Sequence, residues 1–327
     1  MSTSRLTLAV REHGLTLPSE GRIAVFAPRL DADLSALDRA RVEVIQPLKP
    51  DHDGFAQAGF ETVIEESDRY CVAVVFLPRA KAQGRDLLAR AAACADFVIV
   101  DGQKTDGIES FLKECRKRAD LSGSVSKSHG RIFWFEGGDF EGWRAAETQD
   151  AGEGFVTRAG VFSADGIDPA SQALAEALPP KLGRVVADLG AGWGYLSAQI
   201  LKRDGVEVVH LVEADHVALD CARLNVADER AQFHWDDVRS FKPGSRVDTV
   251  VMNPPFHTSR RAEPDLGVQF IRTAAKVLAP SGHLWMVANR HLPYEAALRE
   301  SFVKVDEVAG DRSFKILHAQ RPSRVKR

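Results

Sequence analysis

The sequence predicts an α/β protein of two domains, each with a mostly parallel sheet and helices on its faces. Short apolar runs alternate with segments of helical periodicity along the chain, as in repeated strand–helix–strand units. The 327 residues, of which 44% are hydrophobic, suffice for two cores of ordinary size. Glycine-rich, acidic segments at 137–138 and 151–154 predict a boundary near residue 150. We therefore expect domains at 1–150 and 151–327.

The elements of the first domain are predicted from apolar runs that end at prolines and from helical repeats. Ile108, Phe111, Leu112 and Cys115, for example, recur at helical spacing. No glycine turn follows the first strand, so this half repeats the architecture of the second without its motifs. We expect a degenerate duplicate, with an unrelated α/β domain as the alternative. The expected strands are 23–26, 42–45, 70–77, 97–100 and 131–135, and the expected helices are 86–95 and 108–119.

The second domain opens with a helix that Asp168 caps and Pro169 begins. Its last two strands flank a tight turn at 310–313, which predicts an antiparallel pair at the edge of a seven-stranded sheet. The expected strands are 184–187, 208–212, 233–235, 247–252, 283–287, 303–308 and 314–319, and the expected helices are 169–178, 195–201, 267–278 and 294–302.

A glycine loop follows the first strand of this domain and contains Asp188, Gly190, Gly192 and Gly194. A strand that enters such a turn and then a helix brings backbone N–H groups close to a ligand. The nicotinamide fingerprint requires a third glycine where Tyr195 stands, and the terminal strand pair is not typical of that fold. The loop instead resembles the first motif of the class I methyltransferases, which implies S-adenosylmethionine as the cofactor.

Carboxylates end the next two strands. Glu213 follows the second strand, where a carboxylate accepts hydrogen bonds from ribose hydroxyls. Asp236 and Asp237 end the third strand, where one of them is expected to accept from the adenine amine. For any one acid the alternative is a helix cap or a solvated face. Their succession along the chain favours cofactor binding.

The fourth strand delivers Asn253, followed by Pro254, Pro255 and Phe256. An exocyclic amine on a planar ring is a poor nucleophile, because its lone pair is delocalised. The Asn253 oxygen and the Pro254 carbonyl are expected to accept its N–H groups, while Phe256 stacks on the ring. A plain turn is the alternative for an isolated Asn-Pro-Pro segment. Downstream of the glycine loop, the motif predicts a clamp for an amine that is methylated, with Asn253 also beside the cofactor.

Other residues near this motif are candidates for substrate contact. Pro255, His257, Arg260 and Arg261 are expected to meet the substrate, or else to form a solvated loop. The net charge of -3 does not indicate a nucleic-acid binder, so RNA contacts require local basic patches. Such patches are possible in the tail, at Arg321, Arg324, Lys326 and Arg327, and in the first half, at Lys104, Lys113, Arg116, Lys117, Arg118, Lys127 and Arg131.

Several classes of protein are disfavoured. The 4 Cys form no C-x-x-C pair and are expected to be reduced, and no close His/Cys cluster predicts a metal. No apolar run reaches the roughly 18 residues of a membrane span, and the first residues lack the apolar core of a signal peptide. We therefore expect a cytoplasmic protein without metal.

Together these motifs resemble the ribosomal RNA guanine-N2 methyltransferases of the bacterial small-subunit and large-subunit types. The resemblance covers nearly the whole chain. It rests on Val161-Phe162-Ser163, the 188–194 loop, Asn253 to His257, the 288–294 segment and 125–131. Asp168-Pro169-Ala170-Ser171 departs from the Asp-x-Gly-Ser pattern usual in the family, and Asp236-Asp237 stands where the family often has Asn.

The resemblance implies two tandem Rossmann-like methyltransferase domains, the first degenerate and cofactor-free. It implies N2-methylation of a guanine in ribosomal RNA or a ribosomal subunit, with Asn253, Pro254 and Phe256 holding the flipped base. Asp188, Gly190, Gly192, Glu213 and Asp237 would hold the cofactor. The alternatives are an adenine-N6 or protein glutamine-N5 methyltransferase, which share the clamp, and a non-catalytic RNA-binding ribosome assembly factor.

Overall fold

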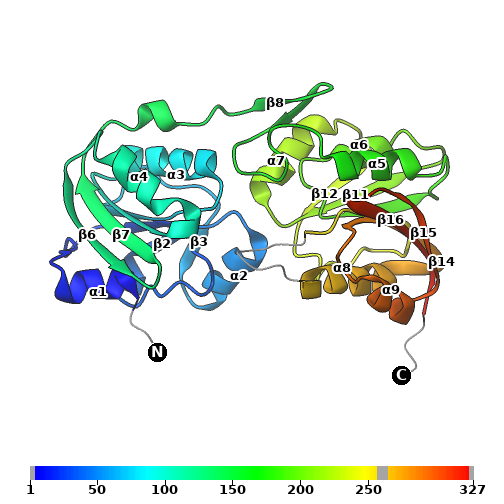
Figure 1. Cartoon of the computed structure of the whole chain (residues 1–327), viewed down its shortest axis with the longest axis horizontal. Helices are drawn as coiled ribbons and strands as arrows, with labels where there is room; N and C mark the ends of the chain where they lie inside the picture. The colour runs from blue at the N-terminus through cyan, green and yellow to red at the C-terminus, as the bar shows by residue number, and fades with distance from the viewer. Residues whose placement is uncertain (1–3, 256–263, 324–327) are drawn as a thin grey trace. The chain divides into compact units, whose positions relative to one another are not determined.

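The computed structural model describes residues 4–255 and 264–323 (Figure 1). The chain divides into two compact units, Met1–Glu147 and Thr148–Arg327. The sequence places the boundary at 150, inside strand β8 (Gln149–Gly152), which pairs with β9 (Phe155–Thr157). The glycines there have positive φ and make the turn of a hairpin that belongs to the second unit.

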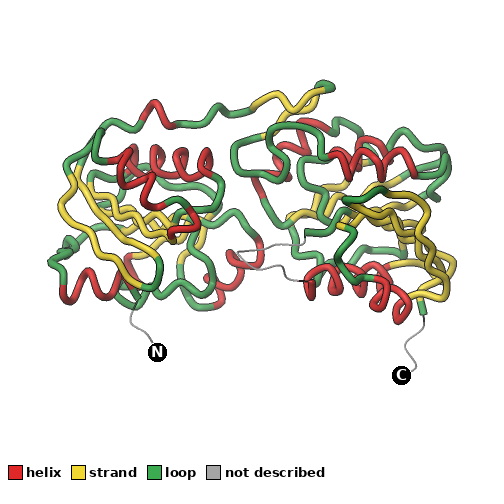
Figure 2. The backbone as a smooth tube through the Cα atoms, in the orientation of Figure 1, coloured by secondary structure: helices red, strands yellow, loops and turns green. Residues whose placement is uncertain are grey.

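Unit 1 is a seven-stranded sheet in the order β3-β2-β1-β4-β5-β7-β6, with helices on both faces (Figures 1 and 2). The first five strands are parallel, and β7 and β6 close the edge as an antiparallel pair. Its elements are α1 Arg5–Glu12, β1 Ile23–Phe26, η1 Arg39–Arg41, β2 Val42–Ile45, α2 Lys49–Gln57, β3 Glu61–Val63, β4 Val72–Phe76, α3 Lys81–Cys94, β5 Phe97–Gln103, η2 Lys104–Asp106, α4 Ile108–Cys115, β6 Leu121–Lys127, β7 Gly130–Glu136 and η3 Glu141–Trp143.

Unit 2 has the same plan. Its main sheet runs β12-β11-β10-β13-β14-β16-β15, again with an antiparallel pair at one edge. In addition to β8 and β9, its elements are α5 Pro169–Ala177, β10 Val185–Leu189, α6 Tyr195–Ile200, β11 Val208–Glu213, α7 His216–Asn225, β12 Ala231–Trp235, β13 Val247–Met252, α8 Pro264–Val277, β14 Leu278–Asn289, α9 Glu295–Ser301, β15 Phe302–Gly310 and β16 Phe314–Pro322.

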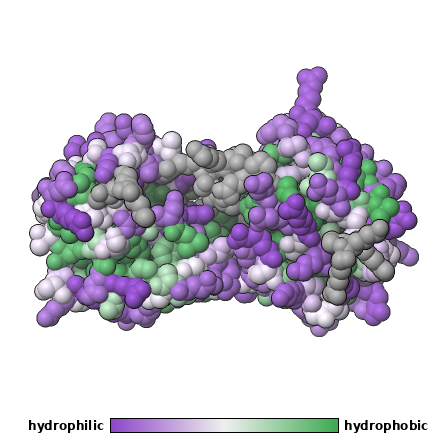
Figure 3. Space-filling view, turned by 90° about the horizontal axis from the view of Figure 1, so that it is seen from below, coloured by the Kyte–Doolittle hydropathy of each residue, from purple (hydrophilic) through white to green (hydrophobic). Residues whose placement is uncertain are grey.

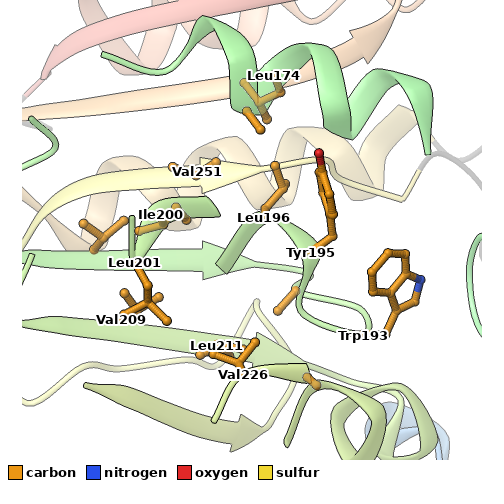
Figure 4. Close-up of a cluster of buried hydrophobic side chains, with 14 of the residues drawn as sticks. Leu174, Trp193, Tyr195, Leu196, Ile200, Leu201, Val209, Leu211, Val226 and Val251 are labelled. Atoms are coloured by element: carbon orange, nitrogen blue, oxygen red, sulfur yellow. The ribbon is translucent and has the colours of Figure 1, made fainter. Parts of the chain in front are cut away.

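Two buried clusters sandwich the sheet of unit 2, so its central strands are apolar on both faces. One cluster joins α5, α6 and α7 to the sheet through residues such as Leu174, Ile200 and Val209 (Figure 4). The other packs α8 and α9 against the opposite face through Ile271 and Leu298. This double burial fixes the strands whose ends carry the candidate site.

The two units match residue by residue where their central strands meet. Phe26 of β1 pairs with Ile45 of β2, as Leu189 of β10 pairs with Val212 of β11. The residue after each central strand, Ala27 or Gly190, has positive φ and donates its N–H to a carbonyl near the end of the neighbouring strand, that of Ile45 or Val212, at 2.9 and 2.8 Å. Shared strand order and shared turn geometry favour duplication of one ancestral domain.

The basic residues predicted to form one side of unit 1 are partly engaged within the unit. Arg131 pairs with Glu109 at 3.0 Å, and the Arg118 guanidinium lies 4.8 Å from the Trp143 ring centroid. On the face seen in Figure 3, apolar side chains gather over unit 1, whereas the visible face of unit 2 is mostly polar. Unit 1 therefore does not present a uniformly basic surface from this side.

The predicted fold class is confirmed: both units are α/β, and the second has a seven-stranded main sheet that ends in the expected antiparallel pair. Every predicted strand and helix is present, with ends shifted by a few residues. The sequence prediction misses α1, α2, β3, β6, α7, β8 and β9, and also the short helices η1, η2 and η3. Several of these elements are short, polar or interrupted: β6 is Leu-Ser-Gly-Ser-Val-Ser-Lys, and α2 contains both Pro and Gly.

Gly183 offers a test of how β10 and β13 are joined at their starts. It has φ +92°, and an added Cβ would lie 2.4 Å from the Asp248 Cβ. The Asp248 carboxylate accepts the N–H groups of Arg184 and Val185 at 2.7 and 3.0 Å. Gly183→Ala should therefore cost about 1–2 kcal/mol for the backbone and about 1–3 kcal/mol for the collision, measured by urea unfolding.

Gly205→Ala is the matched control, because Gly205 has φ +73° and nothing within 4 Å of an added Cβ. It should show only the backbone cost. Equal losses for the two variants would mean that the Gly183–Asp248 contact does not constrain the strands.

Candidate active site at the carboxyl edge of the second sheet

The glycine loop and the Asn253 segment lie side by side at one edge of the sheet. They follow β10 and β13, which are parallel neighbours with Asp188 paired to Val251. A Cβ built on Gly190 would lie 3.9 Å from Pro255 Cδ and 3.2 Å from Phe270 Cε1. A side chain here would crowd the Phe270 ring, and φ +77° favours glycine. The structure thus brings the two predicted motifs to the same edge.

Gly192 and Glu213 join the glycine loop to β11. Gly192 has φ +56°, with nothing within 4 Å of an added Cβ, and its N–H donates to Glu213 Oε2 at 2.8 Å. Glu213 Oε1 accepts the Asp215 N–H at 2.8 Å. A carboxylate has about four acceptor sites, so each Glu213 oxygen keeps capacity for a hydroxyl donor. This arrangement suits the two ribose hydroxyls predicted at this position.

Asp188 is fully buried at the end of β10. Its Oδ2 accepts the Ser197 hydroxyl at 2.7 Å, while its Oδ1 has no partner among the residues described. Burial raises the pKa of Asp188 to about 7, the Ser197 hydrogen bond opposes this, and the nearby Glu213 carboxylate adds to it. A buried acceptor without a partner beside a glycine loop suits a cationic or donor-bearing ligand.

Asp215 is a further acid here that the sequence prediction missed. Its side chain caps α7 by accepting the Val217 N–H at 3.0 Å. Burial raises its pKa to about 7, and the Glu213 carboxylate contributes in the same direction. Burial also raises the pKa of Glu213. Three close carboxyl groups therefore surround the loop, a charge arrangement that favours a positively charged ligand.

Asp236 and Asp237, which the sequence leaves as alternatives, have different surroundings. The Arg239 guanidinium binds the Asp237 carboxylate, with Nε 3.0 Å from Oδ1 and 2.7 Å from Oδ2. Asp236 Oδ1 accepts the Asp237 N–H at 2.8 Å and the Ser240 hydroxyl at 3.0 Å, and its Oδ2 has no partner within the described ranges. Asp236 is therefore the better placed acceptor for an amine.

The side chain of Asn253 is held in one orientation. Its Nδ2 donates to Asp168 Oδ2 at 3.0 Å and to Ser171 Oγ at 2.9 Å. Asp168 also caps α5 by accepting the Ser171 N–H at 2.8 Å. Because a carboxylate only accepts, the amide nitrogen must face Asp168, and the Asn253 oxygen remains available. The sequence predicts Asp168 only as a cap; its contact with Asn253 is new.

Aromatic packing and the side chain of Asn225 hold the glycine loop in place. Trp193 is buried against Phe155 and Tyr195, with ring centroids at 5.5 and 5.9 Å, beyond the strand ends (Figure 4). Asn225 Nδ2 donates to the carbonyls of both Val156 and Trp193 at 2.8 Å. These bonds tie the β8–β9 hairpin and the loop to α7. The sequence offered no signal for Asn225, because its partners lie on other elements.

Several predicted residues cannot be placed. Phe256, His257, Arg260 and Arg261 lie outside the described residues, as do Arg324, Lys326 and Arg327 of the tail. Of the remaining clamp residues, Pro254 is buried and Pro255 is exposed. Across 4–255 and 264–323, no group of His, Cys, Asp and Glu could hold a metal ion. Over the same ranges no helix is both long and apolar enough to cross a bilayer.

A groove of about 500 Å³ lies at the other, amino edge of this sheet. Gly183, Asp248, His283, Trp285 and His318 are among its lining residues. It contains none of the predicted site residues. The glycine loop, the carboxylates and Asn253 therefore make the carboxyl edge the candidate active site.

Comparison with known proteins identifies the family of this chain. The family model described as "Methyltransferase small domain" matches residues 153–318. Ribosomal RNA small subunit methyltransferase C of Hahella chejuensis is 31% identical, over 92% of this chain and 94% of its own length. Ribosomal RNA large subunit methyltransferase G of Streptomyces coelicolor is 34% identical, over 52% of this chain and 46% of its own.

One solved structure resembles the whole chain. It is the 16S rRNA N2 G1207 methyltransferase of T. thermophilus, in complex with AdoMet and guanosine. The TM-score is 0.78 at 25% identity, over 94% of this chain and 90% of that one. The resemblance inferred from the motifs is thus confirmed. The chain belongs to the methyltransferase small domain family, alongside ribosomal RNA small subunit methyltransferase C.

Proposed function

We propose that this S-adenosylmethionine-dependent methyltransferase methylates the exocyclic N2 of a guanine in ribosomal RNA. The observation that carries the proposal is the fixed amide of Asn253, whose nitrogen is committed to Asp168 and Ser171. Its oxygen is left as an acceptor beside the glycine loop. The names of the relatives support ribosomal RNA as the substrate, and the guanosine in the T. thermophilus structure supports the base. A cytoplasmic site of action follows from that substrate.

The residues of the carboxyl edge fit the cofactor. Glu213 would accept from the ribose hydroxyls, and Asp236 from the adenine amine. Gly190 and Gly192 leave room for the backbone to approach it, and Asp188 would supply a buried carboxyl group whose charged form a cationic ligand favours. The cofactor supplies a methyl group on a positively charged sulfur, so the acidic lining stabilises it electrostatically.

The clamp prepares the amine for attack. A guanine N2 amine has two N–H donors and a lone pair delocalised into the ring. The Asn253 oxygen and the Pro254 carbonyl would accept the two N–H groups and favour a pyramidal nitrogen. These hydrogen bonds strengthen as positive charge develops on nitrogen, and the proton leaves after transfer. Alignment of the nitrogen with the methyl group and the sulfur would supply much of the remaining rate acceleration.

Unit 1 would hold no cofactor, because its corresponding edge has different chemistry. By strand register, Gln46 takes the place of Glu213, and its Oε1 accepts the Leu48 N–H at 2.9 Å, as Glu213 does with Asp215. The Gln46 Nε2, however, donates to the Pro28 carbonyl at 2.7 Å. By the same register, Pro28, which has no N–H, stands where unit 2 has Ala191, and unit 1 has an amide where unit 2 has a carboxylate. Unit 1 would instead support RNA binding or folding.

The competing activities differ in product. Adenine-N6 and protein glutamine-N5 methyltransferases also use an Asn-Pro-Pro clamp. A non-catalytic assembly factor would not require the paired contacts of Asn253 with Asp168 and Ser171. Incubation with labelled cofactor and naked ribosomal RNA, 30S or 50S particles should yield N2-methylguanosine at one position. Label in N6-methyladenosine or in protein would support the competing enzymes, and the absence of label from every substrate would contradict enzymatic function.

Asn253→Ala should remove the acceptor but leave the cofactor pocket. We expect kcat to fall by about a hundredfold or more, the cost of losing one positioned group of this kind. Cofactor affinity, measured by calorimetry, should change little. Undiminished turnover in this variant would exclude the proposed clamp.

Gly192→Val should have the opposite effect. An added side chain meets no protein atom within 4 Å, so it would enter the space assigned to the cofactor. Cofactor binding should be lost while the fold persists. Gly205→Val is the control, since that glycine is equally open and has φ +73°. Normal cofactor binding by Gly192→Val would place the pocket elsewhere.

Asp188→Asn tests whether the buried carboxyl group is retained at a cost in stability. Its pKa is about 7 in the folded protein against an ordinary 3.8, so the folded state holds the proton more tightly. Wild-type stability therefore falls as pH rises between these values, and the variant lacks this loss. The melting temperature of the variant minus that of the wild type should increase from pH 5 to pH 8. A difference independent of pH would contradict the raised pKa.

A further inference from the structure

Phe162 has an aromatic side chain that is exposed to solvent. Its residue is 58% exposed, and it is the single aromatic among the exposed large apolar residues of the described ranges. Its neighbour Val161 is buried. An exposed apolar residue is common on proteins, but an exposed ring on a constrained segment requires a closer look.

The segment that carries Phe162 is held at several points. The Trp193 indole N–H donates to the Phe162 carbonyl at 3.0 Å. Ser163 has φ +52°, and its hydroxyl donates to the Gly166 carbonyl at 2.7 Å. The buried Thr157 hydroxyl donates to the Ala164 carbonyl at 2.6 Å. The backbone is therefore rigid on both sides of the ring, and the exposure of Phe162 is not the result of a loose loop.

The same segment connects the two halves of the candidate site. At one end it contacts Trp193, which belongs to the glycine loop. At the other end it leads into Asp168, which fixes Asn253. The Phe162 carbonyl is thus bonded to the loop that we assign to the cofactor. Six residues later in the same segment, Asp168 contacts Asn253, which we assign to the amine.

A base removed from its stack needs a new flat surface, because unstacking costs a few kcal/mol. A rigid ring provides that surface with little loss of conformational freedom. We propose that Phe162 is a positioning residue that stacks on the guanine whose N2 is held by Asn253. The inference rests on the proposed function and adds a stacking contact that holds the base.

Phe162→Ala should weaken guanosine binding and raise the KM for ribosomal RNA. From the usual contribution of a base–aromatic stack, we expect kcat/KM to fall on the order of ten- to a hundredfold. Phe162→Trp should restore most of the loss, since it keeps a flat ring. The probes are guanosine, titrated into protein saturated with S-adenosylhomocysteine, and the ribosomal substrate in steady-state kinetics.

Leu224→Ala is the matched control, because Leu224 is also 58% exposed and lies on α7 of the same unit. It should leave guanosine affinity, cofactor affinity and turnover unchanged. Cofactor affinity should also be unchanged in Phe162→Ala, as should the melting temperature.

Three results would overturn the inference: unchanged guanosine affinity in Phe162→Ala, a loss that Phe162→Trp does not restore, or an equal loss of cofactor affinity. In each case a wild-type protein that forms N2-methylguanosine leaves the proposed function intact. If the wild-type protein neither binds guanosine nor methylates RNA, the proposed function itself fails, and the inference fails with it.

Discussion

The hydrogen bonds of Asp168 are the constraint on which the candidate site depends. One carboxylate caps α5 through the Ser171 N–H and fixes the amide of Asn253 at the end of β13. A donor at position 168 would allow the amide to turn and offer N–H groups to an amine that is itself a donor. The acceptor-only chemistry of the carboxylate removes that alternative. Under the proposed function, the glycine loop and its acids would hold the methyl donor opposite an amide whose orientation is already fixed.

Much of this edge was predictable from the sequence, since β10, β11 and β13 are strong apolar runs that end in Asp188, Glu213 and Asn253. Strand ends of a parallel sheet meet at one edge, so order along the chain implied proximity. The Asp168–Asn253 contact was not predictable, because its partners are 85 positions apart and each has an adequate local explanation as a cap or a turn residue. The sequence also leaves Asp236 and Asp237 as alternatives, and our preference for Asp236 depends on one side chain, that of Arg239, which contacts Asp237.

The two units share one arrangement of strands but carry different side chains at the carboxyl ends of those strands. Strand order, turn geometry and even the bond from the residue after the central strand are shared. The differences lie in a few side chains at strand ends, such as Gln46 where unit 2 has Glu213. A buried apolar sheet tolerates few substitutions, whereas residues at the strand ends can be substituted without disturbing the core. A change of ligand at the edge of one unit would therefore require no change of fold.

The bond between Gly192 and Glu213 also bears on how a ligand enters. Because the Gly192 N–H already donates to the Glu213 carboxylate, the glycine turn is ordered before any ligand binds. Binding then spends little free energy on arranging the backbone. Ordering of this turn would then not limit the rate at which a ligand associates with the carboxyl edge.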